Sequence, residues 1–216
     1  MARTTSHLAP AVAVISVGFA ILMGAAPAAA ESPWKLLEDL RKGLVDSGPI
    51  TGNFKQTYVP AGFETGDTES GDLSMWLPTC LRWNYVEPEK KHFLLCESEV
   101  WSWNDLEPSG NRYRIEPEQE PGLDLLLVDV AKLRERYVAD SERQADGTYL
   151  LHLETPPDAP TRFKAEIRID PVEDRVLGLE YTDGEGNRTR FEISGYQNLA
   201  HTGLFKAPND LEWNDG

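Results

Sequence analysis

Three histidines follow residue 30, and histidine is a side chain suited to metal binding and to acid–base catalysis. His92, His152 and His201 lie in separate segments, with no cysteine or carboxylate at the spacing of a metal site. The sequence also lacks the H-E-x-x-H, G-x-S-x-G, P-loop and dinucleotide-binding patterns. We therefore predict no catalytic residue, no metal and no cofactor.

Carboxylates are the most abundant groups that could do chemistry. The chain has 36 Asp and Glu against 21 Lys and Arg, which gives a net charge of −15. Any two carboxylates could form an acid–base pair across a sheet, but no pair is distinguished from a solvated surface. An enzyme remains the weakest alternative, since one fold can carry several functions. The negative charge repels phosphate backbones, so we expect no nucleic-acid partner.

The chain has two cysteines, Cys80 and Cys96, on either side of the turn-forming Glu87-Pro88. If the flanking segments fold back around Pro88, residues whose numbers add up to 176 face each other. This register places Cys80 opposite Cys96, where a cross-strand disulfide can form in an oxidising compartment. Two free thiols are the alternative, and in either case we predict a structural role.

Residues 71–103 contain an unusual density of aromatic side chains. Because successive side chains of a strand point to opposite faces, apolar residues at alternate positions predict a sheet with one apolar and one polar face. Trp76 and Leu94 break the alternation. The odd-numbered positions carry Leu73, Met75, Leu77, Leu81, Trp83, Tyr85, Phe93, Leu95, Trp101 and Trp103.

The remaining patterns predict one domain, residues 31–216, built mainly from strands. Ser32-Pro33 starts a helix that ends at Gly43 or Gly48, and a second amphipathic helix carries Leu123, Leu126, Leu127, Val130 and Leu133. With so many strands and so few helices, we predict a single strongly curved antiparallel sheet, an unclosed barrel whose mouth the helices cover. The predicted strands span residues 51–58, 71–77, 80–86, 92–95, 100–104, 111–115, 149–154, 163–170, 175–182 and 188–197.

The first thirty residues have the features of a secretory signal peptide. Arg3 is followed by an apolar stretch, residues 12–23, and by the small residues Ala28-Ala29-Ala30. We predict cleavage after about Ala30 and export to the periplasm; a retained N-terminal anchor is the alternative.

Several groups of residues resemble, in the same order, the motifs of one family. They are Gly52-Asn53-Phe54-Lys55-Gln56, Gly71-Asp72-Leu73, Arg82-Trp83-Asn84-Tyr85, Trp101-Ser102-Trp103, Asp183-Gly184 and Phe205-Lys206-Ala207-Pro208. The family is LolA, the periplasmic carriers of outer-membrane lipoproteins. The resemblance implies an unclosed barrel of about eleven strands with a helical lid over a hydrophobic cavity. It also implies a carrier that takes an acylated lipoprotein from an inner-membrane ABC transporter and passes it to an outer-membrane receptor. We expect a monomer.

On this interpretation the lid carries Leu123, Leu126, Leu127 and Val130. One departure concerns the lid, because family members often have an Arg where this chain has Leu77. A carrier or sensor for another amphiphile, such as a glycolipid or an aryl-polyene-type lipid, is therefore the alternative to a lipoprotein carrier. The predicted cavity lining is Phe54, Leu73, Met75, Leu77, Leu81, Trp83, Tyr85, Phe93, Leu95, Trp101 and Trp103.

Overall fold

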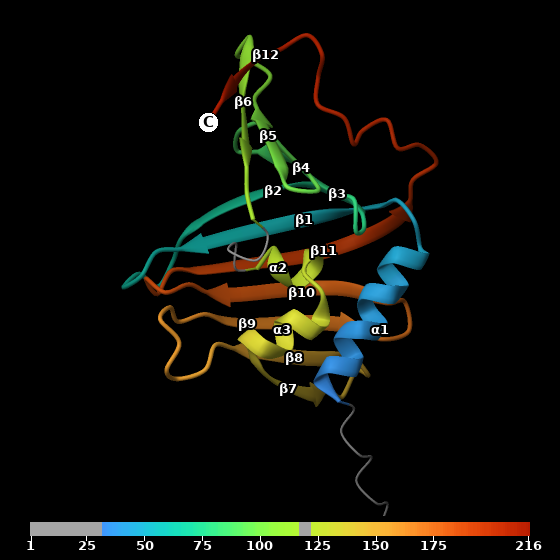
Figure 1. Ribbon diagram of the computed structural model, residues 1–216, viewed down its shortest axis with the longest axis vertical. Coiled ribbons are helices and arrows are strands. Elements are labelled where there is room, and N and C mark those ends of the chain that lie inside the picture. Colours follow the sequence, from blue (N-terminus) through green and yellow to red (C-terminus); the bar gives the residue numbers. More distant parts are fainter. Residues whose placement is uncertain (1–31, 117–121) are drawn as a thin grey trace, which may run out of the picture.

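The computed structural model describes residues 32–116 and 122–216, so the predicted signal peptide lies outside the described residues. One twelve-stranded sheet forms the body of the protein (Figure 1). Its order is β12-β6-β5-β4-β3-β2-β1-β11-β10-β9-β8-β7, and β12 and β7 are its free edges. The strands are β1 Ile50–Val59, β2 Asp67–Trp76, β3 Cys80–Glu87, β4 Lys91–Cys96, β5 Glu99–Trp103, β6 Ser109–Arg114, β7 Val138–Arg143, β8 Tyr149–Glu154, β9 Lys164–Asp170, β10 Arg175–Thr182, β11 Arg188–Asn198 and β12 Glu212–Asp215.

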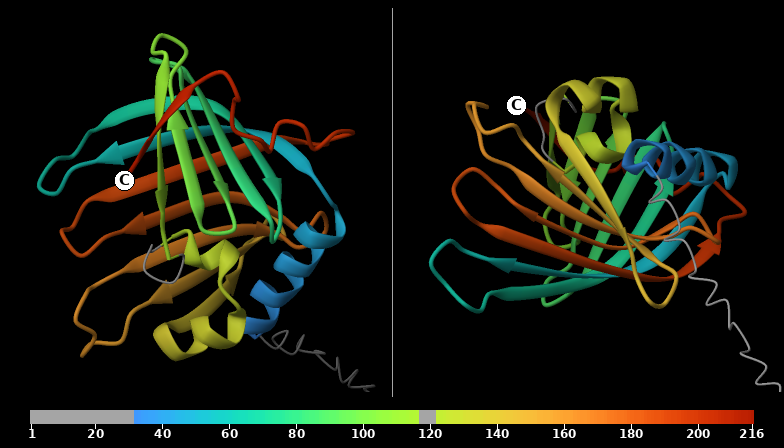
Figure 2. Two further views of the ribbon diagram at one scale, coloured as in Figure 1. Left: turned by 45° about the horizontal axis from the view of Figure 1, so that its top comes forward. Right: turned by 90° about the horizontal axis from the view of Figure 1, so that it is seen from below.

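The sheet has the predicted fold class, with helices lying against the concave face of an unclosed barrel (Figure 2). Neighbouring strands are antiparallel, except that β12 pairs with β6 in parallel. Each predicted strand is present, with ends shifted by a few residues. Two strands were not predicted. β7 is a mostly exposed edge strand without apolar alternation, and β12 has only four residues.

Helix α1, Pro33–Asp46, crosses the concave face and buries Leu36, Leu37, Leu40 and Leu44. Pro33 fits the first helical turn because its missing N–H would have no helical partner there. The helix ends before Gly48, whose φ of +67° suits a residue without a side chain. Gly43 lies inside the helix, where a Cβ atom would meet the Asp174 side chain at 2.2 Å.

The prediction of one continuous second helix is wrong. The chain forms two short helices, α2 Asp124–Leu127 and α3 Val130–Arg136. Between them Val128 is extended, and the Asp129 carboxylate accepts a hydrogen bond from Ala131 N at 2.8 Å. Asp129 therefore starts α3 as an N-cap, which the apolar periodicity of the segment conceals.

The apolar side chains form two clusters on opposite faces of the sheet. The larger lies between the concave face and the helices, and the smaller lies beneath the C-terminal segment, residues 199–213. None of the helices in the described residues combines the length and the apolarity that crossing a membrane requires.

In the aromatic-rich residues 71–103, odd-numbered side chains do not stay on one face of the sheet throughout. The face they point to changes between β4 and β5. In the β3–β4 pair, Leu81 faces Leu95 and Trp83 faces Phe93, so the odd-numbered residues stay on the concave face. In the β4–β5 pair, Leu94 faces Trp101 and Leu95 faces Val100, because only two residues form the turn between the strands.

This register corrects the prediction for Trp101 and Trp103. Both lie in the smaller cluster, with Trp76 and Leu94, on the face opposite the helices. Trp76 and Leu94, which broke the alternation in the sequence, therefore belong to a second apolar face of the sheet.

Candidate functional site

An apolar cavity of about 130 Å³ lies between the helices and the concave face of the sheet. Residues from α1, α2, the two positions before α2 and five strands surround it, and all but Gly122 have apolar or aromatic side chains. The lining is Leu37, Leu40, Leu73, Met75, Trp83, Gly122, Leu123, Leu125, Leu126, Ile167, Val176, Leu179, Tyr181, Phe191 and Ile193. Such a surface offers contact area without directional bonds, which suits a flexible alkyl chain.

A second hollow, of about 300 Å³, adjoins the cavity on the side of β3 to β6. Trp83, Leu123 and Phe191 line both spaces and stand between them. The other lining residues are Tyr85, Phe93, Leu94, Leu95, Val100, Tyr113 and Ile115. We call the 130 Å³ space the inner cavity and the 300 Å³ space the outer hollow.

The structure divides the predicted cavity residues into four groups, with Trp83 in two of them. Leu73, Met75 and Trp83 line the inner cavity, while Trp83, Tyr85, Phe93 and Leu95 line the outer hollow. Phe54, Leu77 and Leu81 are buried in the larger cluster but line neither space. Trp101 and Trp103 lie on the other face.

Sequence analysis missed two parts of the lining. Leu37 and Leu40 come from α1, whose apolar side was recognised but assigned only to covering the sheet. The strands β9 to β11 supply Ile167, Val176, Leu179, Tyr181, Phe191 and Ile193. Apolar residues alternate with polar ones in these strands as they do in residues 71–103. The sequence pattern therefore could have identified them as cavity lining.

We call helices α2 and α3, residues 124–136, the lid. Leu123, just before α2, and Leu126 line the inner cavity; Leu127 and Val130 pack against the larger cluster. Leu125, which was not predicted, is buried and lines the cavity as well.

A buried carboxylate braces the lid internally. Asp124 is 0% exposed, and its oxygens accept hydrogen bonds from Gly122 N at 3.0 Å and from the Tyr137 hydroxyl at 2.6 Å. Arg136 lies 3.0 Å from the same carboxylate. Burial raises the pKa of Asp124 above its ordinary value, although these partners stabilise the charged form. The contacts join the start of α2 to the end of α3, so the lid is held together as a unit.

Helix α1 holds the lid from outside. The Arg41 guanidinium donates a hydrogen bond to the carbonyl of Val128, the buried residue between α2 and α3. Glu38 pairs with Arg134 at 2.6 Å, and the Arg134 guanidinium lies over the Trp34 ring, 5.8 Å from its centroid. Burial lowers the pKa of Arg41. Leu77, where family members often have an Arg, is buried in the core, and the polar contacts with the lid come from α1.

Polar groups on the concave strands near the outer hollow bond to one another. The Tyr85 hydroxyl donates to Gln56 Oε1 at 2.5 Å, and Lys91 pairs with Glu69 at 2.6 Å while lying 4.5 Å from the Tyr85 ring centroid. Burial raises the pKa of Tyr85, so its hydroxyl stays neutral. No cluster of His, Cys, Asp or Glu suited to a metal occurs in residues 32–116 and 122–216.

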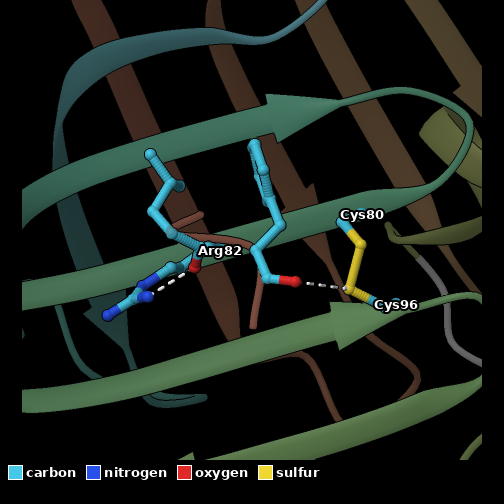
Figure 3. The surroundings of a disulfide bond; sticks show 5 residues. Cys80, Arg82 and Cys96 are labelled. Carbon is cyan, nitrogen blue, oxygen red and sulfur yellow. Dashed lines mark hydrogen bonds between the residues drawn. A yellow bond between two sulfur atoms is a disulfide. The ribbon is translucent and has the colours of Figure 1, made fainter. Parts of the chain in front are cut away.

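A disulfide joins Cys80 and Cys96 on the face opposite the helices (Figure 3). The two residues are direct cross-strand partners, with Cα atoms 4.2 Å apart. The C-terminal segment packs over them, and its backbone is held by Arg82, which donates to the Leu204 carbonyl. The Arg82 guanidinium also lies 5.2 Å from the Trp103 ring centroid. These contacts fix β3, β4 and β5 behind the outer hollow.

A third hollow, of about 560 Å³, is larger than both apolar spaces and differs from them in character. Its walls include Glu166, Arg168, Glu192 and the ion pair of Arg190 with Glu180, at 2.5 Å. Charged walls of both signs do not suit an alkyl chain. We therefore place the functional site at the two apolar spaces, although they are smaller.

Comparisons with known proteins identify related sequences. A family model described as outer membrane lipoprotein carrier protein LolA matches residues 47–207. An outer-membrane lipoprotein carrier protein of Xanthomonas campestris is 27% identical over 150 residues, covering 68% of this chain and 71% of that protein. An outer-membrane lipoprotein carrier protein of Xanthomonas axonopodis is similar to the same extent, 27% over 150 residues.

A solved structure shows the same fold. An uncharacterised conserved protein from Thermus thermophilus aligns with a TM-score of 0.55 at 15% identity, covering 86% of this chain and 100% of that one. A LolA superfamily protein from Nitrosomonas europaea aligns less closely, with a TM-score of 0.47 at 10% identity, covering 84% of this chain and 100% of that one. Because the family model spans most of the described residues, the chain belongs to the LolA family of outer membrane lipoprotein carrier proteins.

Proposed function

We propose that this protein binds the acyl chains of lipoproteins in its apolar interior and carries them across the periplasm, from the inner to the outer membrane. The observation that carries the proposal is the inner cavity, an apolar space beneath a lid, in a chain of the LolA family. We propose an inner-membrane ABC transporter as the donor and an outer-membrane receptor as the acceptor, and the resemblance to the family supports both.

The energetics suit a carrier. Exposing an alkyl chain to water costs about 0.8 kcal/mol per CH₂, so a 16-carbon chain represents about 12 kcal/mol. A carrier has to offer comparable apolar contact and still release its cargo. An interior without directional bonds to the ligand meets both needs.

The lid has to move before a whole alkyl chain can enter the inner cavity. The inner cavity, at about 130 Å³, is smaller than the roughly 300–1,000 Å³ of pockets that enclose small ligands. Leu125 and Leu126 reach into it from α2, so displacement of the lid enlarges the space. We propose that the leucines occupy the interior in the empty protein and retreat when an acyl chain arrives.

Displacement of an apolar fluorescent dye tests the binding. A palmitoylated peptide should displace the dye from the mature protein, and the same peptide without its acyl group should not. Leu126→Trp, which fills the cavity, should weaken the displacement at least tenfold, whereas Val172→Trp, at a turn residue that is 86% exposed, should leave it unchanged. Equal effects of the acylated and unacylated peptides would refute the proposal.

Mass spectrometry of material that co-purifies with the exported protein distinguishes the cargo. A diacylated or triacylated lipoprotein supports lipoprotein transport. A glycolipid or another free lipid would instead indicate a carrier for a different amphiphile, the alternative that Leu77 first suggested.

A further inference from the structure

The concave face of the sheet changes from apolar to polar at Tyr85. The Tyr85 ring lines the outer hollow next to Phe93, and the two ring centroids lie 5.8 Å apart. The Tyr85 hydroxyl donates to Gln56, and the Lys91 ammonium group, which pairs with Glu69, lies over the Tyr85 ring. We call Gln56, Glu69, Tyr85 and Lys91 the polar cluster. It adjoins the apolar lining through the Tyr85 ring.

A glycine lets Tyr85 reach across the strand beside it. In the sheet register, Gly71 on β2 stands between Phe54 on β1 and Tyr85 on β3. A Cβ atom at Gly71 would meet the Asn84 carbonyl oxygen at 1.9 Å, so the backbone leaves no room for a side chain there. The Tyr85 ring packs edge-on against Phe54, with centroids 4.9 Å apart, and its hydroxyl reaches the β1 side chain. Paired strands therefore fix the position of the polar cluster.

The Gln56 amide is oriented with a donor to spare. Because Oε1 accepts the hydrogen bond from Tyr85, the amide nitrogen Nε2 is left to donate elsewhere. Within residues 32–116 and 122–216, Nε2 has no hydrogen-bond partner. Gln56 is half-buried and its nitrogen is not sealed from solvent, so a ligand in the interior can reach it.

The polar cluster carries no net charge. Lys91 and Glu69 neutralise each other at 2.6 Å, with side chains that are 35% and 24% exposed. Burial raises the pKa of Tyr85, so its hydroxyl is neutral. A charged ligand group would lose hydration here without meeting an unpaired opposite charge. A neutral acceptor gains the Gln56 donor without that cost.

We propose that the polar cluster recognises the uncharged carbonyl group, of an ester or an amide, that joins an alkyl chain to the rest of its ligand. Gln56 Nε2 donates to the carbonyl oxygen, and the alkyl chain continues past the Tyr85 ring into the apolar interior. The inference rests on the proposed acyl-chain binding and adds the chemistry of the linkage. Gln56 is the specificity-determining residue, and Tyr85 is a positioning residue that orients its amide.

Two peptides that differ only in the linkage test this inference. One carries an O-palmitoyl serine, which is an ester, and the other an O-hexadecyl serine, which is an ether with the same number of carbons and no carbonyl group. The ether is the more apolar, so apolar contact alone favours it. In dye displacement from wild type, the ester should nevertheless bind about fivefold more tightly.

The outcomes separate this inference from the proposed function. Equal affinities, or tighter binding of the ether, would overturn recognition of the linkage while leaving acyl-chain binding intact. If neither peptide displaces the dye, acyl-chain binding itself fails.

Substitutions in the polar cluster test the assignment to Gln56. Gln56→Met keeps the length of the side chain without an N–H donor, so it should weaken ester binding about fivefold and leave ether binding unchanged. Tyr85→Phe keeps the ring but releases the amide, and it should reduce the ester preference even if the first variant does not fold. Gln197→Met, at an exposed residue of β11, is the matched control and should keep the wild-type preference. An ester preference that survives in the folded variants, or an equal loss for both peptides, would contradict the assignment.

Discussion

Replacing Arg41 by Met should release the lid without removing its apolar contacts. Met keeps an unbranched stem of similar reach but cannot donate to the Val128 carbonyl. Val128 is 4% exposed, so in the closed state this acceptor loses its partner and is not hydrated. An unsatisfied buried acceptor costs about 1–3 kcal/mol.

Part of that cost is offset. The guanidinium of Arg41 is partly buried in the closed state, which lowers its pKa, and Met does not carry this desolvation penalty. We therefore expect a net shift of about 1–1.5 kcal/mol towards the open lid, which is about a tenfold change in population.

Amide hydrogen exchange measures this shift without any ligand. The amides of Leu126, Leu127 and Val128 donate to the carbonyls of Leu123 and Asp124 within α2. Helices of four and seven residues are marginal on their own, so these amides exchange when the lid detaches. Arg41→Met should speed their exchange about tenfold, with the amides of the sheet unchanged.

Lys42→Met is the matched control. Lys42 is the neighbouring cation on α1, is exposed, and pairs with Asp46 on its own helix. The control should leave exchange in the lid at the wild-type rate. Equal rates in wild type and Arg41→Met, with both proteins folded, would refute the assignment of Arg41 as the contact that holds the lid.

Three further predictions concern the disulfide, the buried carboxylate and the second cluster. Replacing Cys80 and Cys96 together by Ala opens a link across 16 positions and should lower the free energy of unfolding by about 3 kcal/mol in urea titrations; an unchanged midpoint would contradict this. Burial raises the pKa of Asp124 on folding, so its contribution to stability falls as the pH rises from its unfolded pKa of about 3.9 through the folded value. The free energy of unfolding of wild type minus that of Asp124→Asn should therefore fall as the pH rises above about 4, and a rise would refute the assignment. Trp103→Ala should cost about 3–5 kcal/mol of stability yet leave the affinity for a palmitoylated peptide unchanged; weaker binding by the folded variant would contradict the placement of Trp103 outside the cavity.

The sequence predicted those features that depend on local periodicity. The strands β1 to β6 and β8 to β11 follow from alternation and turn residues, and the register around Pro88 follows from symmetry about one turn. The apolar side of α1 was equally visible in Leu37, Leu40 and Leu44. These features require no knowledge of distant contacts.

Features that depend on how elements meet were missed or wrong. Trp101 and Trp103 have the parity of the cavity residues, but a two-residue turn reverses the face and only the paired register shows it. The break between α2 and α3 depends on Asp129 acting as an N-cap in the middle of an apolar pattern. The contact of Arg41 with Val128 spans 87 positions, and no local pattern predicts such a partner.

Photo-cross-linking in the periplasm tests most directly whether the interior holds the cargo. A photoreactive residue at Leu126, in the wall of the inner cavity, should trap a diacylated or triacylated lipoprotein through its lipid part. The same residue at Val172, on the exposed β9–β10 turn, should not trap it. Adducts at Leu126 that contain no lipid, or equal adducts at both positions, would contradict acyl-chain binding in this cavity.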